Sequence, residues 1–160
     1  MIGIEIAMAA MLLFAESAAE TAPPPLPEGR LQLFAGNNLG ANFLVMDEIK
    51  PTGDGYDFWF YQANAKPVVI GPGKSVVQSL EHGRVHCQDR TYTRLFVAGY
   101  SREGTALVTL PPASAEHIVG NATQDFAARV LCDRVELPAT NTVVGYRRAL
   151  EVTQQMIGGR

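Results

Sequence analysis

Two cysteines are the residues of this chain with the clearest chemical potential. Cys87 ends a β-like run in VHCQDRTYTRLF (85–96), and Cys132 ends a segment with helical spacing. The N-terminus has the pattern of an export signal, which would bring both thiols into an oxidising compartment. There, an even number of cysteines favours a disulfide. Such a bond would close a loop of about 45 residues and contribute roughly 4 kcal/mol to stability.

A metal site is the first alternative for this region. His82, His86 and Asp89 flank Cys87, and their side chains are of types that bind transition metals. Their spacing lacks the paired Cys-x-x-Cys units of structural zinc sites, so the disulfide is favoured over the metal. A catalytic thiol, with His117 or another histidine as its base, is favoured less still. We predict no metal, no cofactor and no catalytic residue.

An aromatic run, YDFWFYQA (56–63), offers a candidate binding surface. Aromatic residues favour strands, and strict alternation places Trp59 and Tyr61 on one face with Phe58 and Phe60 on the other. Trp59 and Tyr61 are therefore candidates for a partner-binding surface. The favoured interpretation of that face is a packed core under a C-terminal helix.

The elements that hold these residues form a predicted antiparallel sheet. Short apolar runs alternate with turns rich in Gly, Pro, Asn and Asp, which is typical of hairpins. Six runs fit this pattern: 31–34, 43–49, 56–63, 75–87, 91–100 and 105–110. Gly83 lies inside the fourth run, where a glycine often marks a β-bulge. An extra residue at Gly83–Arg84 would bring Leu80 and Val85 onto one face.

Helical spacing begins only after Gly120. In TQDFAARVLC (123–132), two apolar pairs have a spacing of four residues: Phe126 with Val130, and Ala127 with Leu131. This spacing predicts one apolar helix face, with Phe126 and Val130 buried against the sheet. If Phe126 is fully buried, its replacement by alanine should cost about 3–5 kcal/mol. A second amphipathic segment, 142–157, predicts a further helix.

These patterns together define the expected architecture. The fold class is α+β, with an antiparallel β-sheet meander of about five to six strands. A disulfide-tethered helix lies on one face of the sheet, and a further helix is C-terminal.

Composition limits the class of protein. The chain has 160 residues, 47% of them hydrophobic and 18% charged, which suits one folded domain with a modest core. Its formal net charge is −3, and its longest basic run is Arg147–Arg148. Nucleic-acid binding is therefore not expected.

The N-terminus predicts export. An apolar run from Ile6 to Ala15 is followed by small residues, which is the pattern of a signal peptide over 1–19. The run is too short to cross a bilayer as a helix, so no transmembrane anchor is expected. Residues 20–30 are rich in proline and predict an extended linker without stable contacts to the domain. The expected location is the periplasm or the cell surface.

Three segments carry a family resemblance: FLVMDEI (43–49), DGYDFWFY (54–61) and SLEHGRVHCQDRTYTRLFVAGYSREG (79–104). With the helix that ends at Cys132, they resemble the surface-adhesin protein E-like domain family of Gram-negative bacteria. The family positions are Asp47, Ile49, Trp59, Cys87, Tyr92 and Cys132. The resemblance implies an antiparallel sheet with a disulfide-linked helix over 31–134. Residues 135–160 are then a C-terminal extension, expected to be helical.

The resemblance also shapes the functional expectation. Family members known as adhesins bind host matrix proteins, so we expect an exported, non-enzymatic envelope or surface protein. Its expected partner is a protein or another envelope or matrix component, and a homo-oligomer is compatible with the sequence. The alternative is a small periplasmic enzyme or a metal- or ligand-binding protein that uses the region of His82, His86 and Asp89.

Overall fold

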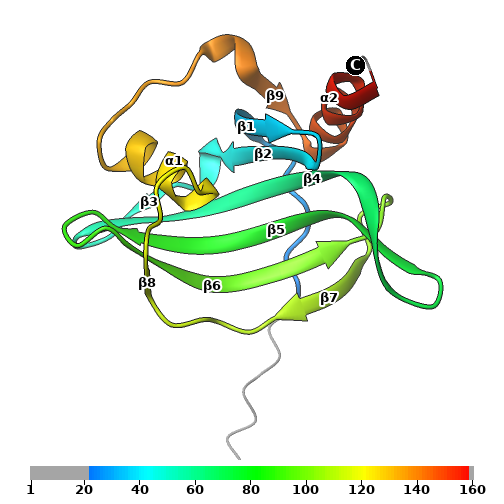
Figure 1. Cartoon of the computed structure of the whole chain (residues 1–160), viewed down its shortest axis with the longest axis horizontal. Coiled ribbons are helices and arrows are strands. Elements are labelled where there is room, and N and C mark those ends of the chain that lie inside the picture. Colours follow the sequence, from blue (N-terminus) through cyan, green and yellow to red (C-terminus); the bar gives the residue numbers. More distant parts are fainter. Residues whose placement is uncertain (1–21, 159–160) are drawn as a thin grey trace, which may run out of the picture.

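One antiparallel sheet forms the centre of the computed structural model, which describes residues 22–158 (Figure 1). Seven strands form its main path, in the order β7 (Ala106–Leu110), β6 (Thr91–Tyr100), β5 (Lys74–His86), β4 (Gly55–Gly71), β2 (Gly40–Val45), β1 (Arg30–Asn37) and β9 (Thr142–Val144). Two short strands lie off this path: β3 (Lys50–Pro51) pairs with β4, and β8 (Glu116–His117) pairs with β6. The predicted signal peptide, 1–19, lies outside the described residues.

The α+β class is confirmed, but the number of strands is larger than predicted. The six predicted runs correspond to β1, β2, β4, β5, β6 and β7, whereas the sheet has nine strands. The additional three strands, β3, β8 and β9, have only two or three residues each. Such short strands have no hydrophobic period of their own, so the sequence does not indicate them.

The sheet has a core on each face, and β4 contributes to both. Tyr61 belongs to a core cluster with Leu31, Phe43 and Tyr146, while Phe58 and Phe60 belong to a second cluster with Val85 and Leu131. The alternation predicted for β4 is therefore confirmed. Two 3₁₀ turns, Met46–Glu48 and Ala139–Asn141, complete the regular structure.

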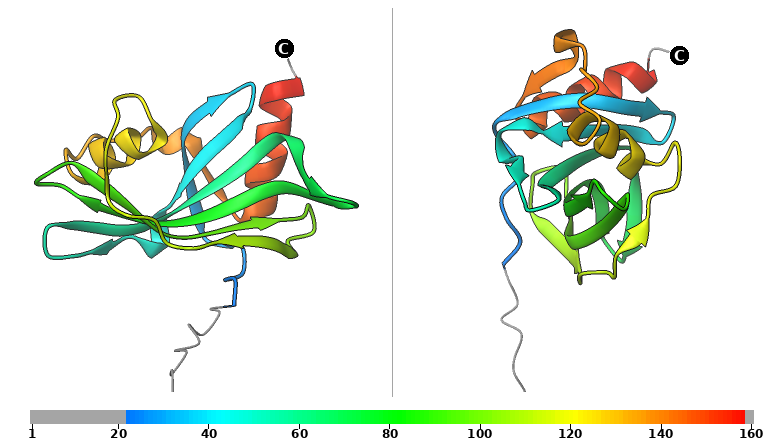
Figure 2. Two further views of the ribbon diagram at one scale, coloured as in Figure 1. Left: turned by 60° about the horizontal axis from the view of Figure 1, so that its bottom comes forward. Right: turned by 90° about the vertical axis from the view of Figure 1, so that its left-hand side faces the viewer.

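Helix α1 (Thr123–Leu131) lies over one face of the sheet and covers the second cluster (Figure 2). A disulfide joins its C-terminal end to the residue that follows β5. Cys87 and Cys132 are bonded, with their Cα atoms 5.4 Å apart. The predicted pairing is thus present. The buried face of α1, however, consists of Asp125, Ala127, Ala128 and Leu131. Ala127 and Leu131 of the predicted apolar face are thus buried, whereas Phe126 and Val130 are only partly buried. The predicted burial of Phe126 and Val130 against the sheet is therefore wrong.

The irregularity near Gly83 lies on β6 instead of β5. His82 pairs with Phe96 and Gly83 pairs with Arg94, so Leu95 is the extra residue. Leu80 and Val85 remain on opposite faces, each in a different core cluster, and the predicted realignment is wrong. Gly83 has another role, since a Cβ atom at this position would collide with the ring of Tyr92.

The proline-rich segment before β1 packs against the domain, which contradicts the predicted free linker. The Tyr100 hydroxyl donates a hydrogen bond of 2.6 Å to the Pro24 carbonyl. Leu26 is buried in the first core cluster. The amide of Tyr146 donates to the Pro27 carbonyl at 2.9 Å. Proline cannot donate to a sheet ladder, but its carbonyl can still accept.

The C-terminal region belongs to the same fold. β9 pairs with β1 at one edge of the sheet, and α2 (Tyr146–Gly158) packs Tyr146, Ala149 and Leu150 into the first core cluster. The predicted helix over 142–157 therefore begins later than expected. Gly145 separates strand from helix with a φ of 78°, a conformation that favours glycine. Within residues 22–158, no helix is long and apolar enough to span a membrane.

Candidate functional site

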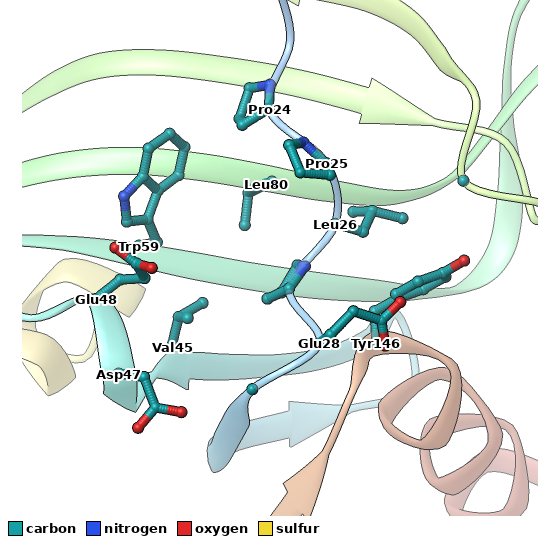
Figure 3. A pocket seen from close by; sticks show the side chains of 13 residues that line it. Pro24, Pro25, Leu26, Glu28, Val45, Asp47, Glu48, Trp59, Leu80 and Tyr146 are labelled. Carbon is teal, nitrogen blue, oxygen red and sulfur yellow. The ribbon is translucent and has the colours of Figure 1, made fainter.

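A groove of about 570 Å³ lies between the N-terminal segment and the sheet (Figure 3). The segment from Pro24 to Gly29 crosses the strands and forms one wall. β2, β4 and β5 contribute the floor, and Tyr146 at the start of α2 contributes the far end. The apolar lining consists of Pro24, Pro25, Leu26, Pro27, Val45, Trp59, Leu80 and Tyr146.

Trp59 is the aromatic platform of this groove and the single tryptophan of the chain. His82 on the neighbouring strand stacks on the indole, with ring centroids 4.3 Å apart and planes 8° apart. Burial lowers the pKa of His82, so the imidazole is neutral at neutral pH. Because His82 covers one face of the indole and holds its orientation, the remaining indole surface is presented to the groove.

Carboxylates form the rim. Glu28, Asp47 and Glu48 are exposed at its edge, and the charged side chains that line the groove within residues 22–158 are all acidic. Asp47 is already paired, since Arg30 donates to its Oδ1 at 2.6 and 2.9 Å. These hydrogen bonds lower the pKa of Asp47. Glu48 lies 3.9 Å from Lys50, a loose and exposed ion pair.

Tyr61, the second predicted surface residue, is fully buried and cannot contact a partner. Its hydroxyl donates a 2.6 Å hydrogen bond to Gln78 Oε1, and Gln78 Nε2 donates to the Ser101 carbonyl at 2.7 Å. Burial also raises the pKa of Tyr61. The candidate surface role is therefore wrong for Tyr61, whose burial with residues of α2 matches the favoured interpretation of a packed core. Trp59 does line a groove.

The histidines of the alternative site are engaged separately. His82 stacks on Trp59, and His86 Nδ1 lies 2.9 Å from a carboxylate oxygen of Asp54. Asp89 accepts hydrogen bonds from the backbone and hydroxyl of Thr91. Across the described part of the chain, no group of three or more His, Cys, Asp or Glu side chains is arranged to hold a metal ion.

A second polar cluster lies on the opposite face, and sequence reasoning missed it. Tyr92 donates a short hydrogen bond to Glu81, and burial raises the pKa of this carboxyl group. Arg94 Nε is buried without a hydrogen-bond partner within the described chain. These residues line a cavity of about 190 Å³ beneath the segment that precedes α1. Glu81 lies on β5 and Tyr92 and Arg94 lie on β6, so only the pairing of the two strands brings them together.

The groove residues outside β4 were also missed. Leu26, Glu28 and Glu48 come from a proline-rich segment and a turn, neither of which has a periodic signal. The pair Asp47–Glu48, which follows a buried strand after one residue, was the available clue, because consecutive acids are seldom fully buried. The family resemblance marks Asp47 as a family position and assigns it no role.

Comparisons with known proteins address the fold. No protein-family model matches the sequence, and no curated protein matches it significantly. Among solved structures, the structure of Haemophilus influenzae protein E aligns with a TM-score of 0.50 and 16% sequence identity. The alignment covers 71% of this chain and 91% of that chain. The two proteins share a fold.

This likeness is consistent with the family resemblance at the level of architecture. At 16% identity it shows the fold alone, because one fold can support unrelated functions. Membership of the protein E-like family stays a prediction. Of the family positions, Cys87 and Cys132 form the disulfide, Tyr92 packs over Gly83, and Trp59 lines the groove.

Proposed function

We propose that this chain is an exported, non-enzymatic protein of the cell envelope or cell surface that binds a macromolecular partner through the Trp59 groove. Its disulfide is compatible with an oxidising compartment. The shared fold with Haemophilus influenzae protein E and the resemblance to a surface-adhesin family support an adhesin-like role. The partner is a protein component of the envelope or of a host matrix.

The composition of the groove is the observation that carries this proposal. An apolar floor with an aromatic platform is bordered by exposed carboxylates, of which Asp47 is neutralised by Arg30. Glu28 forms no ion pair with another described residue, and Glu48 has only the loose pair with Lys50, so both can attract a cation. Tryptophan and tyrosine surfaces stack well on apolar and cationic side chains. The groove therefore suits an extended partner segment that carries apolar residues and at least one lysine or arginine.

To test this proposal, the oxidised full chain is immobilised and exposed separately to envelope extract and to matrix proteins. The proteins that it retains are then identified. A retained protein is then titrated against the soluble chain and against each variant by isothermal titration calorimetry, a readout that does not depend on Trp59. Trp59→Ala is expected to weaken binding by about tenfold or more, as removal of an aromatic anchor does. The double variant Glu28→Lys/Glu48→Lys reverses two charges at the rim of the groove and leaves the core side chains unchanged.

The matched control is Glu136→Lys, because Glu136 is an exposed acid outside the groove. We expect this variant to bind like the unmodified chain. Failure of both sources to supply a partner would contradict a binding role. A partner retained equally by the rim variant and by Glu136→Lys would contradict the groove as its site.

A further inference from the structure

The tip of the long β4–β5 hairpin, residues 66–74, is an apolar projection with no core beneath it. Figure 2 shows this hairpin extending beyond β6 and β7. Val68, Val69 and Ile70 are 53%, 76% and 43% exposed, respectively. Folding normally removes large aliphatic side chains from water, but these three consecutive residues stay in contact with water at the tip. Such a tip indicates an interaction site.

Both faces of the tip are apolar. Val68 and Val69 pair in regular register with Val76 and Ser75, so their side chains point to opposite faces of the hairpin. Ile70 follows as the unpaired residue of a β-bulge. The turn beyond them is Gly71–Pro72–Gly73, which presents no polar side chain. A flat protein surface would bury only one of these faces. A medium that surrounds the tip, such as the acyl region of a bilayer, buries both.

The charges at the base of the tip have one sign. From Phe58 to Leu80 the chain contains no Asp or Glu, and its only charged residues are Lys66 and Lys74. Both lysines are exposed, and neither forms an ion pair with another described residue. An apolar tip with flanking lysines is complementary to anionic headgroups over an apolar interior.

A neighbouring turn extends the apolar surface. Leu39, between β1 and β2, is 71% exposed. The amide of Ala65 at the base of the hairpin donates a 2.8 Å hydrogen bond to the Leu39 carbonyl, which holds the two loops together. Leu39 and Val68 line the same shallow depression.

We propose that this tip is a peripheral membrane-contact site that inserts into bilayers containing anionic lipids. The backbone edges of a two-stranded hairpin cannot be satisfied in the hydrocarbon core, so insertion is shallow, about 5–10 Å. The lysines then lie at the headgroup level. This site is separate from the Trp59 groove, and neither proposal depends on the other.

The first experiment is sedimentation of the oxidised full chain with vesicles of equimolar phosphatidylcholine and phosphatidylglycerol, or of phosphatidylcholine alone. The sequence also contains an apolar run at residues 6–15, so each result is a difference between variants of the same full chain. Val69→Asp should reduce binding to anionic vesicles by about fivefold or more. The matched control is Val119→Asp, since Val119 is 72% exposed and far from the hairpin in sequence; it should bind unchanged.

A charge variant tests the lipid class. Lys66→Glu/Lys74→Glu should weaken binding to anionic vesicles by about tenfold or more and leave binding to neutral vesicles nearly unchanged. Arg102→Glu, at an exposed position outside the hairpin, should have a much smaller effect.

The second experiment places a fluorescent probe in the tip. In a Trp59→Phe background, Val69→Trp provides the single tryptophan, and its emission should shift to the blue and be quenched by brominated phosphatidylglycerol. Val119→Trp in the same background is the control and should show neither effect. Equal sedimentation of Val69→Asp and Val119→Asp, or an unshifted and unquenched tip tryptophan, would overturn the proposal.

Discussion

Trp59 and Tyr61 show how two residues on one face of a strand acquire different roles. Tyr61 belongs to the first core cluster, together with residues of α2. Its hydroxyl donates a hydrogen bond to the buried Gln78 side chain. Trp59 lies two residues earlier on the same face of β4, where it is only partly buried and its indole borders the groove. The residue type does not explain this difference in burial, since both side chains are aromatic with one polar atom.

The Tyr61 hydroxyl is expected to stabilise the fold measurably. Tyr61→Phe leaves the buried Oε1 of Gln78 without its donor, which should lower the free energy of unfolding by about 1–3 kcal/mol. Urea denaturation followed by circular dichroism measures this loss. Tyr56→Phe removes a hydroxyl from the same strand at a partly exposed position and should cost less than about 0.5 kcal/mol. Equal losses for the two variants would show that the buried hydrogen bond adds no stability.

At the scale of elements, α1 illustrates a helix that approaches its sheet through small residues. Ala127 and Ala128 are both buried, and Leu131 fills the space near the disulfide. Close approach through alanines leaves the larger Phe126 at the side of the interface, where it packs on Phe34 with ring centroids 6.1 Å apart. The disulfide at the end of α1 fixes this arrangement.

The two apolar positions of α1 should therefore differ in cost. Leu131→Ala creates a cavity in the second core cluster and should lower the free energy of unfolding by about 2–5 kcal/mol. Phe126→Ala removes a partly exposed ring and should cost only about 1–2 kcal/mol, less than expected for a fully buried phenylalanine. Urea denaturation of the oxidised variants compares them directly. A larger loss for Phe126→Ala would mean that the buried face of α1 is assigned incorrectly.

At the scale of the whole molecule, the N-terminal segment and the start of α2 meet on one face of the sheet. The amides of Gly145 and Tyr146, at the start of α2, donate to the carbonyls of Gly29 and Pro27. Leu26 and Leu150 belong to the same core cluster. The N-terminal segment is consequently a wall of the groove as well as part of the core.

Leu26 is expected to anchor this wall. Leu26→Ala should lower the free energy of unfolding by about 2 kcal/mol or more, because the side chain is buried among core residues. It should also speed hydrogen exchange at the amides of Gly145 and Tyr146, whose acceptors lie in the segment. Leu39→Ala is the matched control, since Leu39 is exposed and should change stability by less than about 0.5 kcal/mol. Unchanged exchange in Leu26→Ala would show that the segment does not depend on this anchor.

The sequence by itself determined the six longer strands, the alternation along β4, and the bond between Cys87 and Cys132. Strand alternation and turn chemistry are local properties, so they can be read within a few residues. The cysteine pairing followed from the number of thiols and the expected compartment. The same local reading could assign Trp59 to a face but could not show whether that face was covered.

Only the tertiary structure decided where the proline-rich segment goes and therefore that a groove exists. Its carbonyls find their donors far away in the chain: Tyr100 and Pro24 are 76 residues apart. No periodic pattern encodes such a pairing, because a carbonyl acceptor is present at every residue and its partner is selected by packing. The partial exposure of Phe126, the short strand β9 and the different burial of Trp59 and Tyr61 were decided in the same way. Each depends on which surface another element happens to cover, which is a property of the assembled core.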